Sequence, residues 1–274
     1  FKWIKNRKKG ITGYIKVNSV NGTSDLIELP KGMKYTESAY FNDYLPRLLR
    51  FKYPTLIFGS ANFELDNDGN PYFIVPVFKY KAVGLKRDVK GVVIVDPING
   101  KTKYYKTKDV PSWVDHVYDA DLIIEQVDDW GLYQKGFFNS LFSQTGVVMT
   151  TDGYNYLVKD DDVFLYTGIT SVSTDESNIG FILANMRTKE TFFYQVPGAE
   201  EYSAMASAEG QVQQMNYTST FPLLINLNNR PTYLVSLKDN AGLVKMYAFI
   251  DVEDYQKVVV TDASQGVEKA KENY

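Results

Sequence analysis

The 274-residue chain contains no cysteine and a single histidine, His116. Thiol nucleophiles, cysteine-ligated zinc or iron–sulfur centres and metal sites built from several histidines are therefore excluded. A serine–histidine catalytic site would have to use His116, and no Gly-x-Ser-x-Gly turn is present to serve it, so this side chain is expected to be an ordinary surface histidine. The lack of thiols is also compatible with an extracytoplasmic location in a bacterium.

A strong net charge is missing too. The chain has 30 basic and 33 acidic residues and a pI near 5.4, so it has no global field that would attract nucleic acid or an anionic membrane. Nucleic acid is therefore not expected as a partner. Neither a Gly-x-Gly-x-x-Gly nor a Walker A pattern occurs, so nucleotide binding is not expected either.

Long apolar runs and a signal-peptide pattern are likewise absent. No run of about 18 apolar residues exists, so nothing in this chain is expected to span a bilayer. The chain opens with Phe1 rather than Met, and basic residues follow around Trp3. We interpret it as the soluble part of a larger protein whose membrane anchor lies in a segment absent from this sequence. The basic run either adjoins that anchor or is a flexible module boundary.

The residues that are present describe a globular protein rich in aromatic side chains. Apolar residues make up 44% and charged residues 23% of the chain, and it contains 21 Tyr and 16 Phe. The length suffices for one large or two ordinary domains. Tyrosine-rich surfaces favour contacts with other proteins.

An internal repeat organises the chain. Residues 13–35 align without a gap on residues 180–202, with Gly, Ile, Asn, Pro and Tyr identical at corresponding positions. Two further matches follow in the same order, 70–77 on 230–237 and 89–96 on 244–251. The offset between the copies decreases along the chain, as shortened loops in the second copy would produce. The sequence therefore predicts a duplicated module.

Each copy is predicted to contain a β-hairpin, one helix and an antiparallel meander, which is an α+β plan with the helix on one face of a sheet. The first helix is expected over residues 36–52, with Thr36 as N-cap, and Pro46 is expected either to kink the helix or to split it near its first turns. The second is expected over 200–216, where alanines predict a flatter packing face. The expected strands are 13–18, 24–30, 55–66, 71–81, 89–96 and 102–106 in the first copy and 180–186, 190–196, 219–228, 231–238, 243–251 and 256–261 in the second.

A Val-Asp-Pro-x-x-Gly turn at residues 95–100 follows the helix and the first meander strands. This arrangement resembles the PepSY family, small cystatin-like modules of the bacterial cell envelope. The resemblance covers about residues 36–106, and the second copy departs from it because residues 251–256 contain no glycine. It implies an extracytoplasmic location and a role in binding or restraining a protein partner. No functional residue is carried over from the family.

The predicted domain plan therefore has three parts. The first α+β module covers residues 11–110 and the second covers 178–262. A central α+β insert occupies 111–177, and the termini, 1–10 and 263–274, are expected to be flexible.

The insert is predicted to begin with a helix over residues 112–130 that Gly131 terminates, followed by strands near 146–150, 154–158 and 162–168. Its polar side is acidic and contains no Lys or Arg, so it either meets a basic partner surface or is simply solvated. The candidate partner-binding residues are Asp115, Asp119, Asp121, Glu125, Asp128 and Asp129. The aromatic segment at 130–142 is expected to pack in the core or between modules.

Metal sites have only weak candidates. Glu64, Asp66 and Asp68 resemble the start of a calcium loop, but Val75 stands where a bidentate Glu is needed, so Asp68-Gly69 is interpreted as a hairpin turn. The run Asp160, Asp161 and Asp162 offers hard oxygen ligands for calcium, with a solvated loop as the alternative interpretation. No other cofactor is expected.

These observations favour a non-catalytic, envelope-associated module that binds a protein or peptide, because catalytic side-chain types are scarce. Exposed strand edges would allow a peptide strand to be added. The first alternative is a carboxylate-dependent hydrolase acting on cell-wall glycan or peptide, which would need a cleft holding two carboxylates. The second alternative is a structural subunit that self-assembles.

Overall fold

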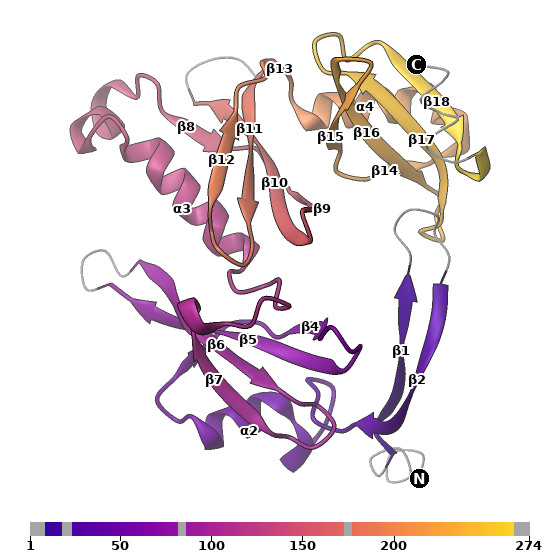
Figure 1. Cartoon of the computed structure of the whole chain (residues 1–274). Coiled ribbons are helices and arrows are strands. Elements are labelled where there is room, and N and C mark those ends of the chain that lie inside the picture. Colours follow the sequence, from indigo (N-terminus) through magenta and orange to yellow (C-terminus); the bar gives the residue numbers. More distant parts are fainter. Residues whose placement is uncertain (1–8, 18–23, 82–85, 173–176, 266–274) are drawn as a thin grey trace. The chain divides into compact units, whose positions relative to one another are not determined.

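A computed structural model of the chain describes residues 9–17, 24–81, 86–172 and 177–265. It shows a mixed α+β protein with several antiparallel sheets (Figure 1). The chain divides into two compact units. The first comprises the described residues up to Leu122 together with Met186–Thr188, and the second comprises the other described residues from Ile123 onward.

The first unit opens with the expected antiparallel pair. Strands β1 (Ile11–Val17) and β2 (Ser24–Met33) are hydrogen-bonded from Val17 opposite Ser24 to Ile11 opposite Met33. The predicted turn at Asn21 and Gly22 lies outside the described residues. The hairpin touches the next sheet through the hydroxyl of Tyr14, which donates to the Gly69 carbonyl at 3.1 Å.

The first helix is shorter than expected. A 3-10 turn, η1 (Phe41–Asp43), precedes α2 (Leu45–Lys52), so the predicted start at Thr36 is wrong. Pro46 does not kink the helix, because it lies in the first turn, where the missing N–H has no helical partner to lose. Leu45 and Leu49 are buried and pack on the following sheet.

That sheet has five strands and is covered on both faces. Its order is β3-β5-β6-β7, with β4 also paired to β5. The expected strand 55–66 is two short strands, because the three residues between them, 59–61, lie opposite only two residues of β5 and the register shifts by one. The strands are β3 (Ile57–Phe58), β4 (Asn62–Leu65), β5 (Pro71–Tyr80), β6 (Arg87–Val95) and β7 (Thr102–Lys106).

The second face of this sheet is covered by an irregular segment that follows the 3-10 turn η2 (Thr107–Asp109). A helix was expected here from residue 112, and that expectation is wrong, since α3 begins at Ala120. The N–H groups of Val117 and Tyr118 donate to the Met186 carbonyl at 3.1 and 2.9 Å instead of to a helical carbonyl. Val114 and Val117 are fully buried in this arrangement.

The second unit contains α3 from Ile123 onward and a six-stranded antiparallel sheet. The helix (Ala120–Tyr133) runs through Gly131, so the expected stop there is also wrong. Glycine serves a close approach at this position, because a Cβ would collide with the Val148 carbonyl. A π-helical turn, η3 (Asn139–Ser143), follows α3.

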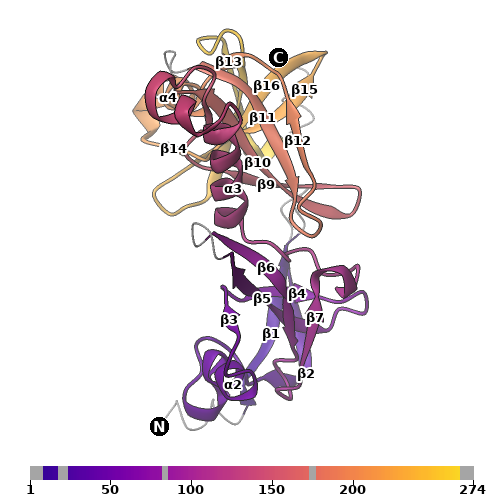
Figure 2. The same cartoon turned by 90° about the vertical axis from the view of Figure 1, so that its left-hand side faces the viewer.

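The sheet order is β12-β11-β10-β8, with β9 paired to β10 and β13 to β11. Helix α3 lies along one face of this sheet (Figure 2). The strands are β8 (Val148–Thr150), β9 (Asn155–Lys159), β10 (Asp162–Ser171), β11 (Ser177–Asn185), β12 (Thr191–Tyr194) and β13 (Gly198–Ala199).

The chain ends in a second five-stranded sheet that packs on α4 (Glu201–Gln211). The expected helix 200–216 breaks after Gln211 into the 3-10 turn η4 (Gln213–Met215). Ala204 and Ala208 are its buried face, as the alanine pattern predicted. The remaining elements are β14 (Thr218–Ser219), β15 (Leu223–Leu227), β16 (Arg230–Lys238), β17 (Val244–Asp251), β18 (Val258–Asp262) and η5 (Ala263–Gln265).

The two five-stranded sheets have the same strand order. The second is β14-β16-β17-β18 with β15 also paired to β16, as the first is β3-β5-β6-β7 with β4 also paired to β5. In each case one helix precedes the sheet in the sequence. The sequence segments matched in the repeat lie on β5 and β16 and on β6 and β17.

Candidate functional site

The six acidic candidates do not form one side of one helix. Asp115 and Asp119 precede α3, and Asp121 lies in its first turn, all within the first unit. Glu125, Asp128 and Asp129 lie on the part of α3 that belongs to the second unit. The expectation that one helix carries all six is therefore wrong, while partner binding by these residues stays a prediction.

Several of these carboxylates have structural partners. Asp128 Oδ1 accepts a hydrogen bond from the backbone N–H of Thr150 at 2.7 Å, which ties α3 to β8. Burial raises the pKa of Asp119, and the positive charge of Arg87 opposes that rise. The positive charge beside Asp119 thus comes from a segment that is distant in the sequence.

His116 is not the ordinary surface side chain expected from the sequence. The carboxylate of Glu64 accepts hydrogen bonds from the N–H groups of Asp115 and His116 at 2.9 and 2.8 Å. The ring Nδ1 of His116 lies 3.2 Å from Glu64 Oε1. Glu64 is 8% exposed, so this pair holds the irregular segment on the first sheet and is not available as a calcium ligand. The Asp68-Gly69 hairpin turn is confirmed, because Asp66 Oδ1 accepts from the N–H groups at positions 68 and 70.

The calcium candidates lie in the turn between β9 and β10. Asp160 and Asp161 have positive φ values of 52° and 64°, as a tight hairpin turn requires. Asp162 Oδ2 accepts a hydrogen bond from the side-chain amide of Asn185 at 2.8 Å. Within the described ranges, no group of three or more His, Cys, Asp or Glu side chains is arranged to hold a metal ion.

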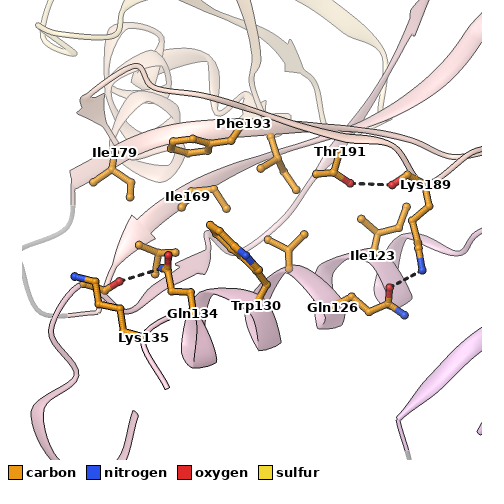
Figure 3. Close-up of a pocket in the computed structure, with 14 residues that line it drawn as sticks. Ile123, Gln126, Trp130, Gln134, Lys135, Ile169, Ile179, Lys189, Thr191 and Phe193 are labelled. Carbon is orange, nitrogen blue, oxygen red and sulfur yellow. Dashed lines mark hydrogen bonds between the residues drawn. The ribbon is translucent and has the colours of Figure 1, made fainter. Parts of the chain in front are cut away.

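A hollow in the second unit lies between α3 and the sheet of β8 to β12. It has a volume of about 620 Å³ and is open to solvent. Ile123 and Trp130 of α3 lie on one side of it, and Ile169 of the sheet lies on the opposite side (Figure 3). Val127 of α3 and Ile182 of the sheet also line it. We call it the α3 groove. Its other lining residues are Gln126, Gln134, Lys135, Gly146, Val148, Ile179, Lys189, Thr191 and Phe193.

Polar groups lie only at the two ends of the α3 groove (Figure 3). At one end, the Lys189 ammonium donates to Gln126 Oε1 at 3.0 Å. At the other end, the Gln134 amide donates to the Gly146 carbonyl at 3.1 Å, with Lys135 beside it. A site of this size with apolar walls and polar ends is typical of a binding pocket.

The lining residues of the α3 groove include no carboxylate and no imidazole. The only hydroxyl is that of Thr191, which donates to the Lys189 carbonyl at 3.2 Å. General acid–base catalysis most often uses histidine or a carboxylate, and of the other groups that can serve, the lining contains the amines of Lys135 and Lys189.

A buried carboxyl group lies elsewhere in the second unit. Glu201 is fully buried at the start of α4 and accepts a hydrogen bond from the Asn178 amide at 2.9 Å. Burial raises the pKa of Glu201, and that hydrogen bond opposes the rise. Tyr166 and Tyr233 complete this cluster. Glu201 does not line the groove, so the paired carboxylates expected of a hydrolase are not found there.

Sequence reasoning missed the α3 groove and misjudged the aromatic segment near it. Residues 130–142 were expected to be packed, yet Trp130, Phe138 and Phe142 are 59%, 75% and 82% exposed. The available signal was that the aromatic and leucine positions follow no helix or strand period, which core segments normally do.

Comparisons with protein-family models, with curated proteins and with solved structures found no match for this chain. The resemblance to PepSY modules therefore stays a prediction. Among the described residues, no helix has the length and apolar character needed to cross a bilayer.

Proposed function

We propose that this chain is a non-catalytic binding module that accepts an apolar segment of a protein or peptide partner in the α3 groove. The observation that carries the proposal is the groove itself, about 620 Å³ in volume, with apolar walls, polar ends and no carboxylate or imidazole in its lining. Pockets of this size bury ligands mainly through apolar contact.

The strand beside the groove suits an extended peptide. β12 ends the path of its sheet, and all four of its residues are exposed. A peptide strand added to such an edge gains main-chain hydrogen bonds, and every second side chain faces the same side. Phe193 and Thr191 face the groove from β12, so alternate side chains of an added strand would lie beside the groove.

We further propose that the two helix-and-sheet modules are copies of one ancestral unit of the PepSY type, on either side of a central α+β insert. The shared strand order and the collinear sequence matches support this. The corresponding location is the bacterial cell envelope.

A matched pair of variants tests the groove. Phe193 lines it, whereas Phe192 is the adjacent residue of β12 on the opposite face, and the two side chains are 50% and 39% exposed. Short synthetic peptides with alternating apolar residues would be titrated into the wild type and into Phe193→Ser and Phe192→Ser, with calorimetric detection. We expect Phe193→Ser to weaken binding about tenfold or more, because a buried phenyl ring contributes roughly 1.5–3 kcal/mol.

Phe192→Ser should change the affinity by less than about twofold, since side chains outside the contact contribute little. Equal losses in the two variants, or no binding of any peptide to the wild type, would contradict the proposal. A mass that rises with protein concentration and that Phe193→Ser restores to a monomer would instead favour the self-assembling subunit.

A further inference from the structure

In the turn after α3, large apolar side chains are exposed to solvent and a polar side chain is buried, the reverse of the usual arrangement. We call the exposed set Trp130, Tyr133, Phe137, Phe138, Leu141 and Phe142 the aromatic tip. All six are 45–82% exposed. Ser140, in the middle of this set, is 8% exposed. A turn that faced only water would bury phenylalanine and expose serine, because apolar surface is costly to hydrate.

The tip is held by its own polar groups. The hydroxyl of Ser140 donates to the Phe137 carbonyl at 2.7 Å, and the amide of Asn139 donates to the Thr145 carbonyl at 3.2 Å. The hydroxyls of Ser143 and Thr145 lie 2.6 Å apart. These bonds satisfy backbone and side-chain polar groups internally, while the phenyl rings remain outside. Such satisfaction is what an apolar or interfacial environment demands.

The charge of this segment is also unusual. Residues 130–151 contain no carboxylate and a single charged side chain, Lys135, although the whole chain has 33 acidic residues. Acidic side chains are repelled by the negative surface of bilayers that contain anionic lipids, and a lysine is attracted to lipid phosphates. The segment is therefore complementary to a phospholipid headgroup layer in charge as well as in apolar surface.

The order of side-chain types agrees with this partner. The most exposed residues, Phe142 and Phe138, lie on the turn beyond the helix, whereas Trp130 and Tyr133 lie on the last turn of α3. Tryptophan and tyrosine favour the headgroup level of a bilayer, and phenylalanine and leucine favour the acyl boundary below it. We propose that the aromatic tip inserts into the surface of a phospholipid bilayer.

This inference goes beyond the binding role of the α3 groove. The groove and the tip share Trp130, so the test leaves Trp130 unchanged. The tip variant is Phe138→Ser with Phe142→Ser, and neither residue lines the groove. The control is Val158→Ser with Phe192→Ser, which removes two exposed apolar side chains (74% and 39%) from elsewhere in the same unit.

The experiment is sedimentation of the full chain with mixed phosphatidylcholine–phosphatidylglycerol vesicles. We expect the wild type and the control to bind, with a blue shift of tryptophan fluorescence, and the tip variant to bind at least about tenfold more weakly, since two phenyl rings lose their burial. Circular dichroism would establish that both variants are folded.

Three results would overturn the proposal: no vesicle binding by the wild type, equal binding by the tip variant, or an equal loss in the control. A concentration-dependent mass that the tip variant abolishes, without vesicle binding, would identify a second copy of the chain as the occupant instead. Because peptide binding by the groove is measured without vesicles, failure of the tip leaves the groove proposal standing, and the reverse also holds.

Discussion

The two helix-and-sheet modules have the same strand order but fill the space between helix and sheet differently. In the first, α2 places Leu45 and Leu49 on β5 and β6. In the second, α4 places Ala204 and Ala208 on β16 and β17. Cores are packed to a constant density. The large side chains of α2 therefore fill the space between helix and sheet in the first module, whereas the small side chains of α4 let its backbone lie close to the sheet in the second. The strand order thus does not dictate the residue size at the helix.

The modules also differ in how they bury a carboxyl group. Glu64 in the first accepts hydrogen bonds from two backbone N–H groups and lies beside His116. Glu201 in the second is fully buried, and the Asn178 amide is its closest polar partner. Glu64 thus supplies hydrogen-bond acceptors to the backbone of the segment around His116, whereas Glu201 lies in a buried site that disfavours its charged form.

The largest expected effect concerns the leucine face of α2. Leu49→Ala should lower the free energy of unfolding by about 2–5 kcal/mol, because it leaves a cavity against the sheet. Urea unfolding followed by circular dichroism measures the loss. Leu48→Ala, at a partly buried position on the same helix, should cost clearly less, and equal costs would show that this face is not tightly packed.

On the alanine face of α4, a larger side chain should destabilise the protein, whereas on the leucine face of α2 a smaller one should. Ala208→Leu should lower the free energy of unfolding by about 1–3 kcal/mol through overpacking, since Ala208 is fully buried. Ala206→Leu, exposed on the same helix, is the control and should have little effect. Thermal unfolding of both variants measures this difference, and equal stabilities would contradict the tight packing of α4 on its sheet.

Glu64→Gln tests the carboxylate of the first module. The amide has one acceptor oxygen in place of two, so the N–H of either Asp115 or His116 loses its partner, at a cost of about 1–3 kcal/mol. Amide hydrogen exchange at residues 114–118 should accelerate. If exchange there matched that of the exposed control variant Asp68→Asn, Glu64 would not be the group that fixes this segment.

Glu201→Gln should have the smallest effect on the free energy of unfolding. At neutral pH this variant should be slightly more stable than the wild type. Because the folded-state pKa is raised, the folded protein holds this proton more tightly than the unfolded chain. The corresponding stability is present at acidic pH and is lost as the pH rises through the raised pKa. Urea unfolding over a pH series should show this loss in the wild type and in the exposed control Glu253→Gln, and a smaller loss in Glu201→Gln.

Strands were predicted well where their alternation or apolar runs were local. The strand expected at 102–106 coincides with β7, and 71–81 differs from β5 by one residue. Glycine and asparagine turn signals mark these boundaries within a few residues of the chain. The starts of α2 and α3 were predicted poorly, whereas α4 begins within one residue of its expected start. The start of α3 was missed because the N–H groups before it find acceptors in Glu64 and Met186, which are distant in the sequence.

The sequence by itself determined the α+β class, the meander strands and the scarcity of catalytic side chains, since each depends on residue type or local periodicity. Only the tertiary structure decided where side chains meet solvent. The α3 groove exists because α3 is held at β8, where Gly131 allows a close backbone approach and Asp128 accepts a hydrogen bond. The apolar residues of β10 to β12 beside this contact are left uncovered. The exposure of Phe138 and the burial of Ser140 also depend on tertiary structure. They follow from hydrogen bonds within a turn, which the periodicity of the sequence does not reveal.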